Sequence, residues 1–290
     1  MKPAPFDYVR AASQAEAADL LTRHGEDARP IAGGQSLAPM LAMRLVRPSV
    51  VIDLNPAADM AGIATHPRAV MIKAMTRQRT LERHSAALAL LPALAKAFPW
   101  IGHPQTRNRG TVGGSLAHAD PAAELPLIAC LLNAEIEVLS TSGARTLKAA
   151  DLFEGAMATS LRPDELLTAV YFPVWQGGRI GTGFEEVNMR GSDYALVAAA
   201  AQISLDGNGA IDRAAIAIGA AGPTPVRLAQ AEAALLGQAP TAAAAAAAAA
   251  LAAQALDPQN DVQASAGYRR RVAAALTRRV LTEAFEEAAR

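Results

Sequence analysis

Two glycine-rich segments hold the residues of this chain whose types and spacing best suit chemistry. The first reads Ala32-Gly33-Gly34-Gln35-Ser36-Leu37 and the second Thr111-Val112-Gly113-Gly114-Ser115-Leu116. A Gly-Gly step lets the backbone approach a ligand closely and adopt positive φ, so that successive N–H groups can converge on an anion. Phosphate is the natural guest, and two such segments can hold one dinucleotide. Either segment alone is more typical of an ordinary tight turn, and only the pair favours a dinucleotide site.

Neither segment matches the two commonest phosphate-binding fingerprints. The G-x-x-x-x-G-K-[ST] loop requires a lysine that both segments lack, and both also lack the G-x-G-x-x-G turn. Residues 178–183 carry loosely spaced glycines, but they lead into the strand-like stretch Gly183-Phe184-Glu185-Glu186-Val187 instead of opening a helix. We therefore interpret residues 178–183 as a linker.

Polar side chains follow the second Gly-Gly segment, within a stretch made otherwise of alanine, leucine and proline. They are His118, Asp120 and Glu124. Asp120 or Glu124 can accept hydrogen bonds from ribityl or ribose hydroxyls more strongly than a neutral side chain can. The alternative is that these acids begin a helix at residue 125, because the first turn of a helix favours negative charge.

The elements that must position these residues divide the chain into three units: residues 1–57, 58–176 and 177–290. In the first unit, Ser13-Gln14-Ala15-Glu16 is a capping box that opens a helix ending near residue 23. Residues 28–32 and 50–54 have the pattern of buried strands. The first Gly-Gly segment therefore follows a strand, where a ligand crevice can form.

Residues 58–176 are predicted to mix strands and helices. Helices are expected at 80–87, 90–98 and 125–133, and strands at 69–75, 135–139 and 166–173, the second of which forms a hairpin with residues 145–147. A polar loop at 102–110 leads into the second Gly-Gly segment. This unit thus carries most of the candidate polar side chains.

Residues 177–290 have a different pattern of predicted elements and few candidate functional side chains. Strands are expected at 184–187, 194–205 and 211–220, with a hairpin turn at 206–209, and helices at 225–236, 241–256 and 268–289. The alanine run 242–250 is of low complexity. Because alanine is the best helix former, we expect a packed helix there rather than disorder.

Composition excludes several function classes. Lys and Arg number 27, as do Asp and Glu, and this balance argues against nucleic acid or an anionic membrane surface as a partner. With neither a signal-peptide run nor a membrane span in its sequence, the chain is expected to be cytoplasmic. Cys130, the only cysteine, lies in an apolar run and is expected to be a buried hydrophobe, so no iron–sulfur or zinc site is expected here. No two of the five histidines share the i, i+4 spacing of a helical metal site.

Several long motifs occur in this sequence in the same order as in a known protein family. They are Arg29-Pro30-Ile31-Ala32-Gly33-Gly34-Gln35-Ser36-Leu37, Gly102-His103-Pro104-Gln105-Thr106-Arg107-Asn108-Arg109-Gly110-Thr111-Val112-Gly113-Gly114, Ala117-His118-Ala119-Asp120-Pro121-Ala122-Ala123-Glu124-Leu125-Pro126, Arg190-Gly191-Ser192-Asp193-Tyr194-Ala195 and Gly222-Pro223-Thr224-Pro225-Val226-Arg227. With them the chain resembles the FAD-binding medium subunit of molybdenum hydroxylases, the carbon monoxide dehydrogenase and xanthine dehydrogenase type of flavoprotein. The resemblance covers nearly the whole chain; it is specific for the family and weak for the substrate.

The resemblance implies an α+β fold. A p-cresol methylhydroxylase-type FAD-binding domain of two α/β lobes (1–57 and 58–176) would precede a C-terminal α/β domain (177–290) with a small antiparallel sheet and helices. Segments 32–37 and 111–115 would hold the pyrophosphate from two sides. The implied FAD-binding residues are Arg29, Pro30, Ile31, Ala32, Gly33, Gly34, Gln35, Ser36, Leu37, Ile101, Thr106, Thr111, Gly113, Gly114, Ser115, Ala117, His118, Asp120, Glu124, Leu161, Leu167, Arg190 and Tyr194.

Three residues of the third unit need separate comment. Tyr194 is either a neighbour of the flavin or a half-buried strand aromatic. Arg190 is a candidate neighbour of the flavin or of charges at the strand end. Glu185 is left out of the site, because some relatives place a lysine contact there and an ionised acid cannot donate a hydrogen bond.

The implied function is electron transfer, with no catalytic residue and no metal in this chain. A large subunit with a molybdenum cofactor would oxidise the substrate, and a small subunit with [2Fe–2S] clusters would pass electrons to FAD here and on to an external acceptor, in a dimer of heterotrimers. Two alternatives stay open: a self-sufficient FAD oxidase or dehydrogenase with His118 as its base, and a non-catalytic nucleotide-binding assembly module. The substrate is open among carbon monoxide, a purine, an aldehyde and an N-heterocycle, because another subunit selects it.

Overall fold

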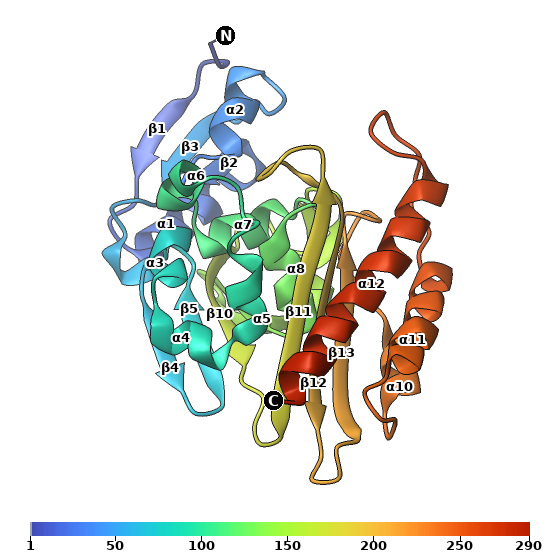
Figure 1. The fold of residues 1–290 in the computed structure, drawn as a ribbon. Coiled ribbons are helices and arrows are strands. Elements are labelled where there is room, and N and C mark those ends of the chain that lie inside the picture. Colours follow the sequence, from blue (N-terminus) through green and yellow to red (C-terminus); the bar gives the residue numbers. More distant parts are fainter. Residues whose placement is uncertain (1) are drawn as a thin grey trace.

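The structure is a computed structural model that describes residues 2–290. It has three sheets of three or more strands and one two-stranded sheet, with helices packed between and around them (Figure 1). The N-terminal sheet is parallel, in the order β1-β3-β2. Its elements are β1 (Asp7–Arg10), α1 (Gln14–His24), η1 (Gly25–Asp27), β2 (Ala28–Ile31), α2 (Leu37–Ala42), β3 (Val50–Asp53) and η2 (Ala58–Met60). Ser13 Oγ accepts the Glu16 N–H at 3.2 Å and a Glu16 carboxylate oxygen accepts the Ala12 N–H, which confirms the predicted helix start.

The second sheet is antiparallel, in the order β4-β5-β10-β6-β7. The strands are β4 (Ile63–His66), β5 (Ala69–Lys73), β6 (Glu135–Ser140), β7 (Gly143–Lys148) and β10 (Leu166–Pro173), with a small hairpin of β8 (Phe153–Gly155) and β9 (Ala158–Thr159). The helices of this region are α3 (Gln78–Glu82), α4 (Ser85–Leu90), α5 (Pro92–Ala97), α6 (Pro104–Arg109), α7 (Val112–His118), α8 (Glu124–Leu131) and α9 (Ala149–Leu152). The predicted strand at 166–173 is confirmed to the residue, whereas the helix predicted at 80–87 is divided between α3 and α4.

Two segments of this region were predicted as loops and are helical. The polar loop 102–110 contains α6, which begins at Pro104, a residue whose fixed φ suits the first turn of a helix. The second Gly-Gly segment forms the first turn of α7, where Thr111 Oγ1 accepts the Gly114 N–H at 3.1 Å. This N-cap bond stabilises a helical turn that the two glycines disfavour by themselves.

The third sheet is antiparallel, in the order β11-β12-β13-β14. It comprises β11 (Arg179–Asn188), β12 (Ala195–Leu205), β13 (Ile211–Gly219) and β14 (Val226–Arg227), and the helices α10 (Ala229–Leu235), α11 (Ala242–Ala255) and α12 (Ala266–Ala288) cover one face. The alanine run lies in α11 and is packed, with Ala245, Ala248 and Ala249 buried. Among residues 2–290, no helix has the length and apolar character needed to cross a membrane.

The linker predicted at 178–183 is wrong, because residues 179–183 belong to β11. A Cβ placed on Gly181 would lie 1.9 Å from the Ala284 carbonyl oxygen, and one on Gly183 would lie 2.2 Å from that of Val280. The two glycines therefore let the backbone of α12 rest directly on the strand (Figure 1).

The third sheet joins the C-terminal helices to the rest of the molecule. In β12, Ala198 and Ala200 belong to the core of the first two units, whereas Val197 and Ala199 belong to the core beneath the C-terminal helices. This alternation follows from the period of two along a strand. Both faces of β12 are thus buried, and the third sheet packs closely beside the candidate site.

Candidate functional site

A cavity of about 520 Å³ lies where the three units meet. It is lined by residues between β2 and α2, by α7 and the turn that leads to α8, by the segment before β10 and by the loop between β11 and β12. The predicted residues that line it are Arg29, Pro30, Ala32, Gly33, Gly34, Gln35, Ser36, Leu37, Ile101, Thr106, Thr111, Gly113, Gly114, Ser115, Ala117, His118, Asp120, Glu124, Leu161, Leu167 and Tyr194. Ile31 and Arg190 do not line it; Ile31 packs beneath Gly34, and the Arg190 carbonyl accepts the Asp193 N–H at 3.0 Å.

The first Gly-Gly segment has unpaired backbone donors. The N–H groups of residues 33–37 have no hydrogen-bond acceptor in the part of the chain that the structure describes, and Ser36 does not cap α2 with its side chain. Gly34 has a φ of 72°, a left-handed conformation that favours glycine. These donors line the cavity and are available to an anion.

Gly33 determines how closely the two segments approach each other. A Cβ at Gly33 would lie 2.2 Å from the Arg109 carbonyl oxygen and 2.9 Å from the Gly110 Cα. Only a residue without a side chain lets the first segment rest on the backbone that precedes α7. The close approach of residue 33 to the backbone of Arg109 and Gly110 therefore requires a glycine at this position.

The second Gly-Gly segment differs from the first, because the protein already pairs most of its donors. The N–H of Val112 donates to the Thr76 carbonyl at 3.0 Å and that of Gly113 to the Ala74 carbonyl at 2.8 Å. Neither Gly113 nor Gly114 has positive φ. A Cβ at Gly113 would lie 2.5 Å from the Ala74 Cβ, so this glycine serves close helix–strand packing. Ser115 adds a hydroxyl to the lining beside this helix start.

The acids after α7 have separate roles. Asp120 Oδ1 accepts the Ala122 N–H at 2.9 Å and so stabilises the turn before α8. Glu124 begins α8 and lines the cavity. The pKa of Glu124 is raised to about 7, chiefly by burial. A backbone hydrogen bond of its own opposes this shift, the charge of Asp120 adds to it, and the charge of Arg107 opposes it. Glu124 can therefore accept or donate a hydrogen bond near neutral pH.

A second acid, Glu186, is near enough to Glu124 to respond to its charge. Glu186 on β11 is 4% exposed; its Oε1 accepts a bond from Asn188 at 2.9 Å and its Oε2 has no partner among residues 2–290. Burial, followed by the charge of Glu124, raises the pKa of Glu186 to about 8. A negative charge on Glu124 therefore favours the protonated form of Glu186.

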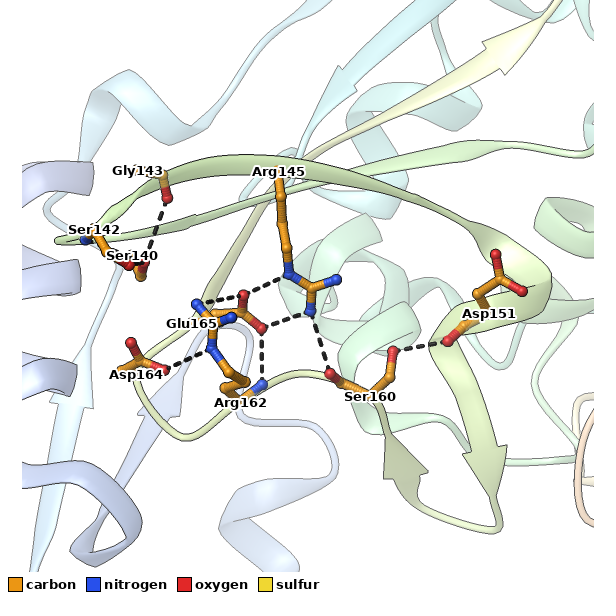
Figure 2. A network of polar contacts seen from close by, with 9 residues as sticks. All are labelled: Ser140, Ser142, Gly143, Arg145, Asp151, Ser160, Arg162, Asp164 and Glu165. Carbon is orange, nitrogen blue, oxygen red and sulfur yellow. Dashed lines mark hydrogen bonds and ion pairs between the residues drawn. The ribbon is translucent and has the colours of Figure 1, made fainter.

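The wall that carries Leu161 and Leu167 is anchored by an ion-pair network (Figure 2). The side chain of Glu165 is 1% exposed and accepts bonds from Arg145 Nε at 2.6 Å and Nη2 at 2.8 Å. The Arg162 backbone N–H donates to the same carboxylate at 2.8 Å, and its guanidinium lies at 3.1 Å. The bond from Arg145 is the main cause of a lowered Glu165 pKa. Glu165 was not predicted, because its partner Arg145 lies 20 residues away in another strand.

Tyr194 and Glu185 lie on different sides of the third sheet. Tyr194 is 64% exposed, stands just before β12 and contributes to the cavity lining. Glu185 points toward α12, where its carboxylate meets Arg279 Nη2 at 2.5 Å. Glu185 does not line the cavity, in keeping with its omission from the predicted site.

Several lining residues were not among the predicted cofactor-binding residues. They are Leu54, Ala74, Met75, Gln78, Gly102, His103, Gly110, Ala122, Ala123, Glu165, Leu166, Ser192 and Asp193. Among them Gln78 stands out, because its Oε1 is buried and unpaired in the described chain. An unpaired buried acceptor beside a cavity suits a ligand donor.

Cys130 is a free, buried cysteine, as predicted. Burial raises the pKa of its thiol to about 12.

Comparison with known proteins covers the chain from end to end. Residues 4–175 match the FAD binding domain in molybdopterin dehydrogenase, and residues 182–284 match the CO dehydrogenase flavoprotein C-terminal domain. The 6-hydroxypseudooxynicotine dehydrogenase complex subunit alpha of Paenarthrobacter nicotinovorans is 41% identical, with 99% of this chain and 97% of that protein aligned. The carbon monoxide dehydrogenase medium chain of Afipia carboxidovorans is 37% identical over 98% of each chain.

Solved structures show the same fold. A chain of the carbon monoxide dehydrogenase from Hydrogenophaga pseudoflava superimposes with a TM-score of 0.95 at 34% identity, over 99% of both chains. A chain of quinoline 2-oxidoreductase from Pseudomonas putida 86 superimposes with a TM-score of 0.94 at 36% identity, also over 99% of both. The expected α+β architecture is confirmed.

Proposed function

This chain belongs to the family of FAD-binding medium subunits of molybdenum hydroxylases, and we propose that its central cavity binds FAD at the residues described above. In this role the chain carries electrons from iron–sulfur clusters of a partner subunit to an external acceptor. The predicted cofactor-binding residues, including Ile31 and Arg190 outside the lining, are part of this proposal.

One observation carries the proposal: unpaired backbone donors of residues 33–37 line a cavity shared by all three units. An anion there would receive several N–H hydrogen bonds without displacing any bond within the protein. The unpaired Gln78 Oε1 supplies an acceptor in the same cavity. A diphosphate with hydroxyl-bearing groups on either side fits this donor and acceptor set.

The cavity residues have distinct tasks. The N–H groups of residues 33–37 hold the diphosphate, while Glu124 pairs with a hydroxyl of the ligand. Ile101, Leu161 and Leu167 exclude water from the ring system, and the network of Glu165 keeps Leu161 and Leu167 in place. FAD, when bound, supplies a carrier that can accept electrons one at a time and release two.

We assign the remaining cofactors to other chains. Cys130 is the only cysteine and is buried, so [2Fe–2S] clusters belong on a small subunit and the molybdenum cofactor on a large one. The relatives support this division, since several are named medium chain or medium subunit. We further propose a dimer of heterotrimers located in the cytoplasm.

The substrate is selected outside this chain. Relatives of similar identity are named for different substrates: nicotine 6-hydroxylase at 40%, carbon monoxide dehydrogenase at 37% and glyceraldehyde dehydrogenase at 35%. Sequence identity to this chain is thus similar for relatives named for different substrates, as expected for a subunit that transfers electrons and does not bind the substrate.

Reconstitution tests the proposal. The purified chain is incubated with FAD, desalted and examined for a flavin absorption band and for FAD stoichiometry. We expect one FAD per chain, whose absorption is bleached by substrate only when the large and small subunits are present. A colourless chain that shows no FAD binding by calorimetry would overturn the proposal, and bleaching by an added organic substrate without partner subunits would favour the self-sufficient alternative with His118.

A further inference from the structure

A second cavity, of about 310 Å³, is lined by residues within 55–63 and by residues 75–77, together with Thr80 and His84. Met75 lines both cavities, so the two are neighbours across the end of β5. Its lining includes the apolar residues Met75 and Ile63 and the polar residues Arg77, Thr80 and His84. None of these polar residues lines the FAD cavity.

Arg77 brings a positive charge to this second cavity without a bonded carboxylate. Its Nη2 donates to Asn55 Oδ1 at 2.5 Å and its Nη1 donates to the Arg109 carbonyl, and both acceptors are neutral. No acid lies within ion-pair distance of Arg77 in residues 2–290. Burial, then the charge of Arg109, lowers the pKa of Arg77, while Asp53 opposes this shift.

Asp53 does not neutralise Arg77 by direct contact. Its carboxylate accepts bonds from the Tyr8 hydroxyl at 2.6 Å and from Asn55 Nδ2 at 2.5 Å, and lies 3.7 Å from Arg10. A guanidinium has five N–H donors, and only two groups of Arg77 are engaged. The remaining donors can form the two-pronged pair that guanidinium makes with a carboxylate or phosphate.

His84 also lines this second cavity. Its Nδ1 accepts the Ala87 N–H at 3.1 Å, so in the neutral ring the proton resides on Nε2. Thr80 contributes a hydroxyl at the rim. Convergent donors around a partly apolar hollow are the usual make-up of a small-molecule site.

We propose that this second cavity binds a small oxyanion, a carboxylate or a phosphate, on the guanidinium of Arg77. The two engaged N–H groups of Arg77 stay bonded to Asn55 and Arg109, and the anion occupies the others. The apolar lining residues accommodate the body of an organic anion.

The same bonds couple this site to the FAD cavity. Asn55 Nδ2 donates to the Ala32 carbonyl at 3.0 Å, and the Arg109 carbonyl is the group against which Gly33 rests. Arg77 thus links the backbone of the first Gly-Gly segment, through Asn55, to the backbone of Arg109. An anion that immobilises Arg77 strengthens both links, so anion and FAD each raise the affinity for the other by the same factor. This coupling rests on the proposed FAD function, whereas the anion site does not.

Calorimetric titration of the full chain tests the site. Inorganic phosphate and benzoate are titrated separately, each against the FAD-free and the FAD-loaded chain, with sodium chloride at matched ionic strength as the control. In the FAD-loaded chain, where FAD already occupies the donors of residues 33–37, we expect saturable binding of one anion per chain. Stronger binding of benzoate to this loaded chain identifies an organic carboxylate, and stronger binding of phosphate identifies a phosphate group. The FAD-free chain can bind an additional anion at residues 33–37. Binding of neither probe, or an equal effect of chloride, would overturn the site.

Arg77→Met is the decisive variant, with Arg79→Met as its matched control, because Arg79 lies two residues away and pairs with Glu82 at 2.7 Å. Arg77→Met should weaken anion binding about tenfold or more, while Arg79→Met leaves it unchanged. Arg77→Lys keeps the positive charge but cannot form the two-pronged hydrogen bond, and it replaces the methionine variant if that variant does not fold. The lysine variant should bind the anion less tightly than the wild-type chain does. Undiminished binding in the folded Arg77 variant contradicts the proposal. Anion binding in a chain that cannot bind FAD would refute the proposed function and leave the site standing.

Discussion

Gly33 shows how one absent side chain shapes the central cavity. A Cβ built on Gly33 would lie only 2.2 Å from the Arg109 carbonyl oxygen. The glycine thus allows two stretches of backbone that are distant in the sequence to lie in contact. The sequence indicated that Gly33 and Gly114 admit a ligand. The structure adds that Gly33 also admits the neighbouring backbone, so substitution there affects both FAD binding and folding.

Gly33→Val should therefore abolish FAD retention and also lower the free energy of unfolding of the FAD-free chain, by about 1–3 kcal/mol. The side chain must push residues 32–34 away from Arg109. Urea unfolding and FAD stoichiometry measure the two effects. Gly191→Ala is the control, because nothing lies within 4 Å of a Cβ there and its φ is not positive; an equal loss in both variants would contradict the packing argument.

Glu186 predicts a pH dependence of stability. Its pKa is about 8 in the folded chain and near its usual 4.5 when unfolded, so the folded state binds the proton more tightly. The stability associated with the protonated acid is complete below about pH 4.5 and is lost as pH rises through about 8. The unfolding free energy of the FAD-free chain should fall across this window, and Glu186→Gln should reduce the fall, leaving the part due to Glu124. Parallel pH curves for variant and wild type would refute this.

At the scale of elements, buried contacts decide how the cavity wall and the strands are held. The segment before β10 is a loop, yet Arg145 and Arg162 fix it through the buried carboxylate of Glu165 (Figure 2). In β11, Gly181 and Gly183 serve the same purpose for α12 by allowing backbone contact. In both cases a residue far along the chain determines the local geometry.

Arg145→Ala should destabilise the chain by about 1–3 kcal/mol and weaken FAD binding, because Glu165 loses its two-pronged partner while staying buried. Adding Glu165→Gln should recover part of the loss, since no unpaired charge then remains. Asp164→Ala is the control, as its pair with Arg162 is exposed. Chemical unfolding and FAD titration of all three variants check this, and a double variant weaker than the single one would argue against charge pairing.

At the scale of the whole molecule, the C-terminal unit is fastened to the others by a few polar links around an apolar interface. Lys96 of α5 donates to the Thr182 carbonyl at 2.6 Å and pairs with Glu287 at 2.8 Å. Arg227 of β14 donates to the Leu131 carbonyl at the end of α8 at 2.9 Å. These links join the third sheet and α12 to helices α5 and α8 of the second unit.

Arg227→Met should loosen this attachment, because the last carbonyls of α8 lose their cationic partner. We expect calorimetry to resolve a broader or split thermal transition, and FAD to restore a single one by binding all three units. Arg271→Met, on the exposed face of α12, is the control. A single sharp transition for Arg227→Met would show that apolar packing alone couples the units.

Much of the fold could be predicted because its signals are local. The capping box at Ser13, the strand at 166–173 and the turn at 206–209 depend on neighbouring residues, and the structure has all three. The errors at 102–110, 111–116 and 178–183 fall in segments rich in glycine or polar residues. There the conformation depends on a Thr111 cap, on Ala74 and on α12, which sequence spacing does not reveal.

By itself the sequence determined the family, the expected cofactor and most of the cavity lining, because the motifs that carry them are contiguous and ordered. Only the tertiary structure decided that the first Gly-Gly segment has free donors while the second does not, that Glu165 is neutralised, and that Arg77 faces a second cavity without a bonded acid. The physical reason is that hydrogen-bond satisfaction and charge pairing belong to groups that meet in space, often from residues distant in the chain.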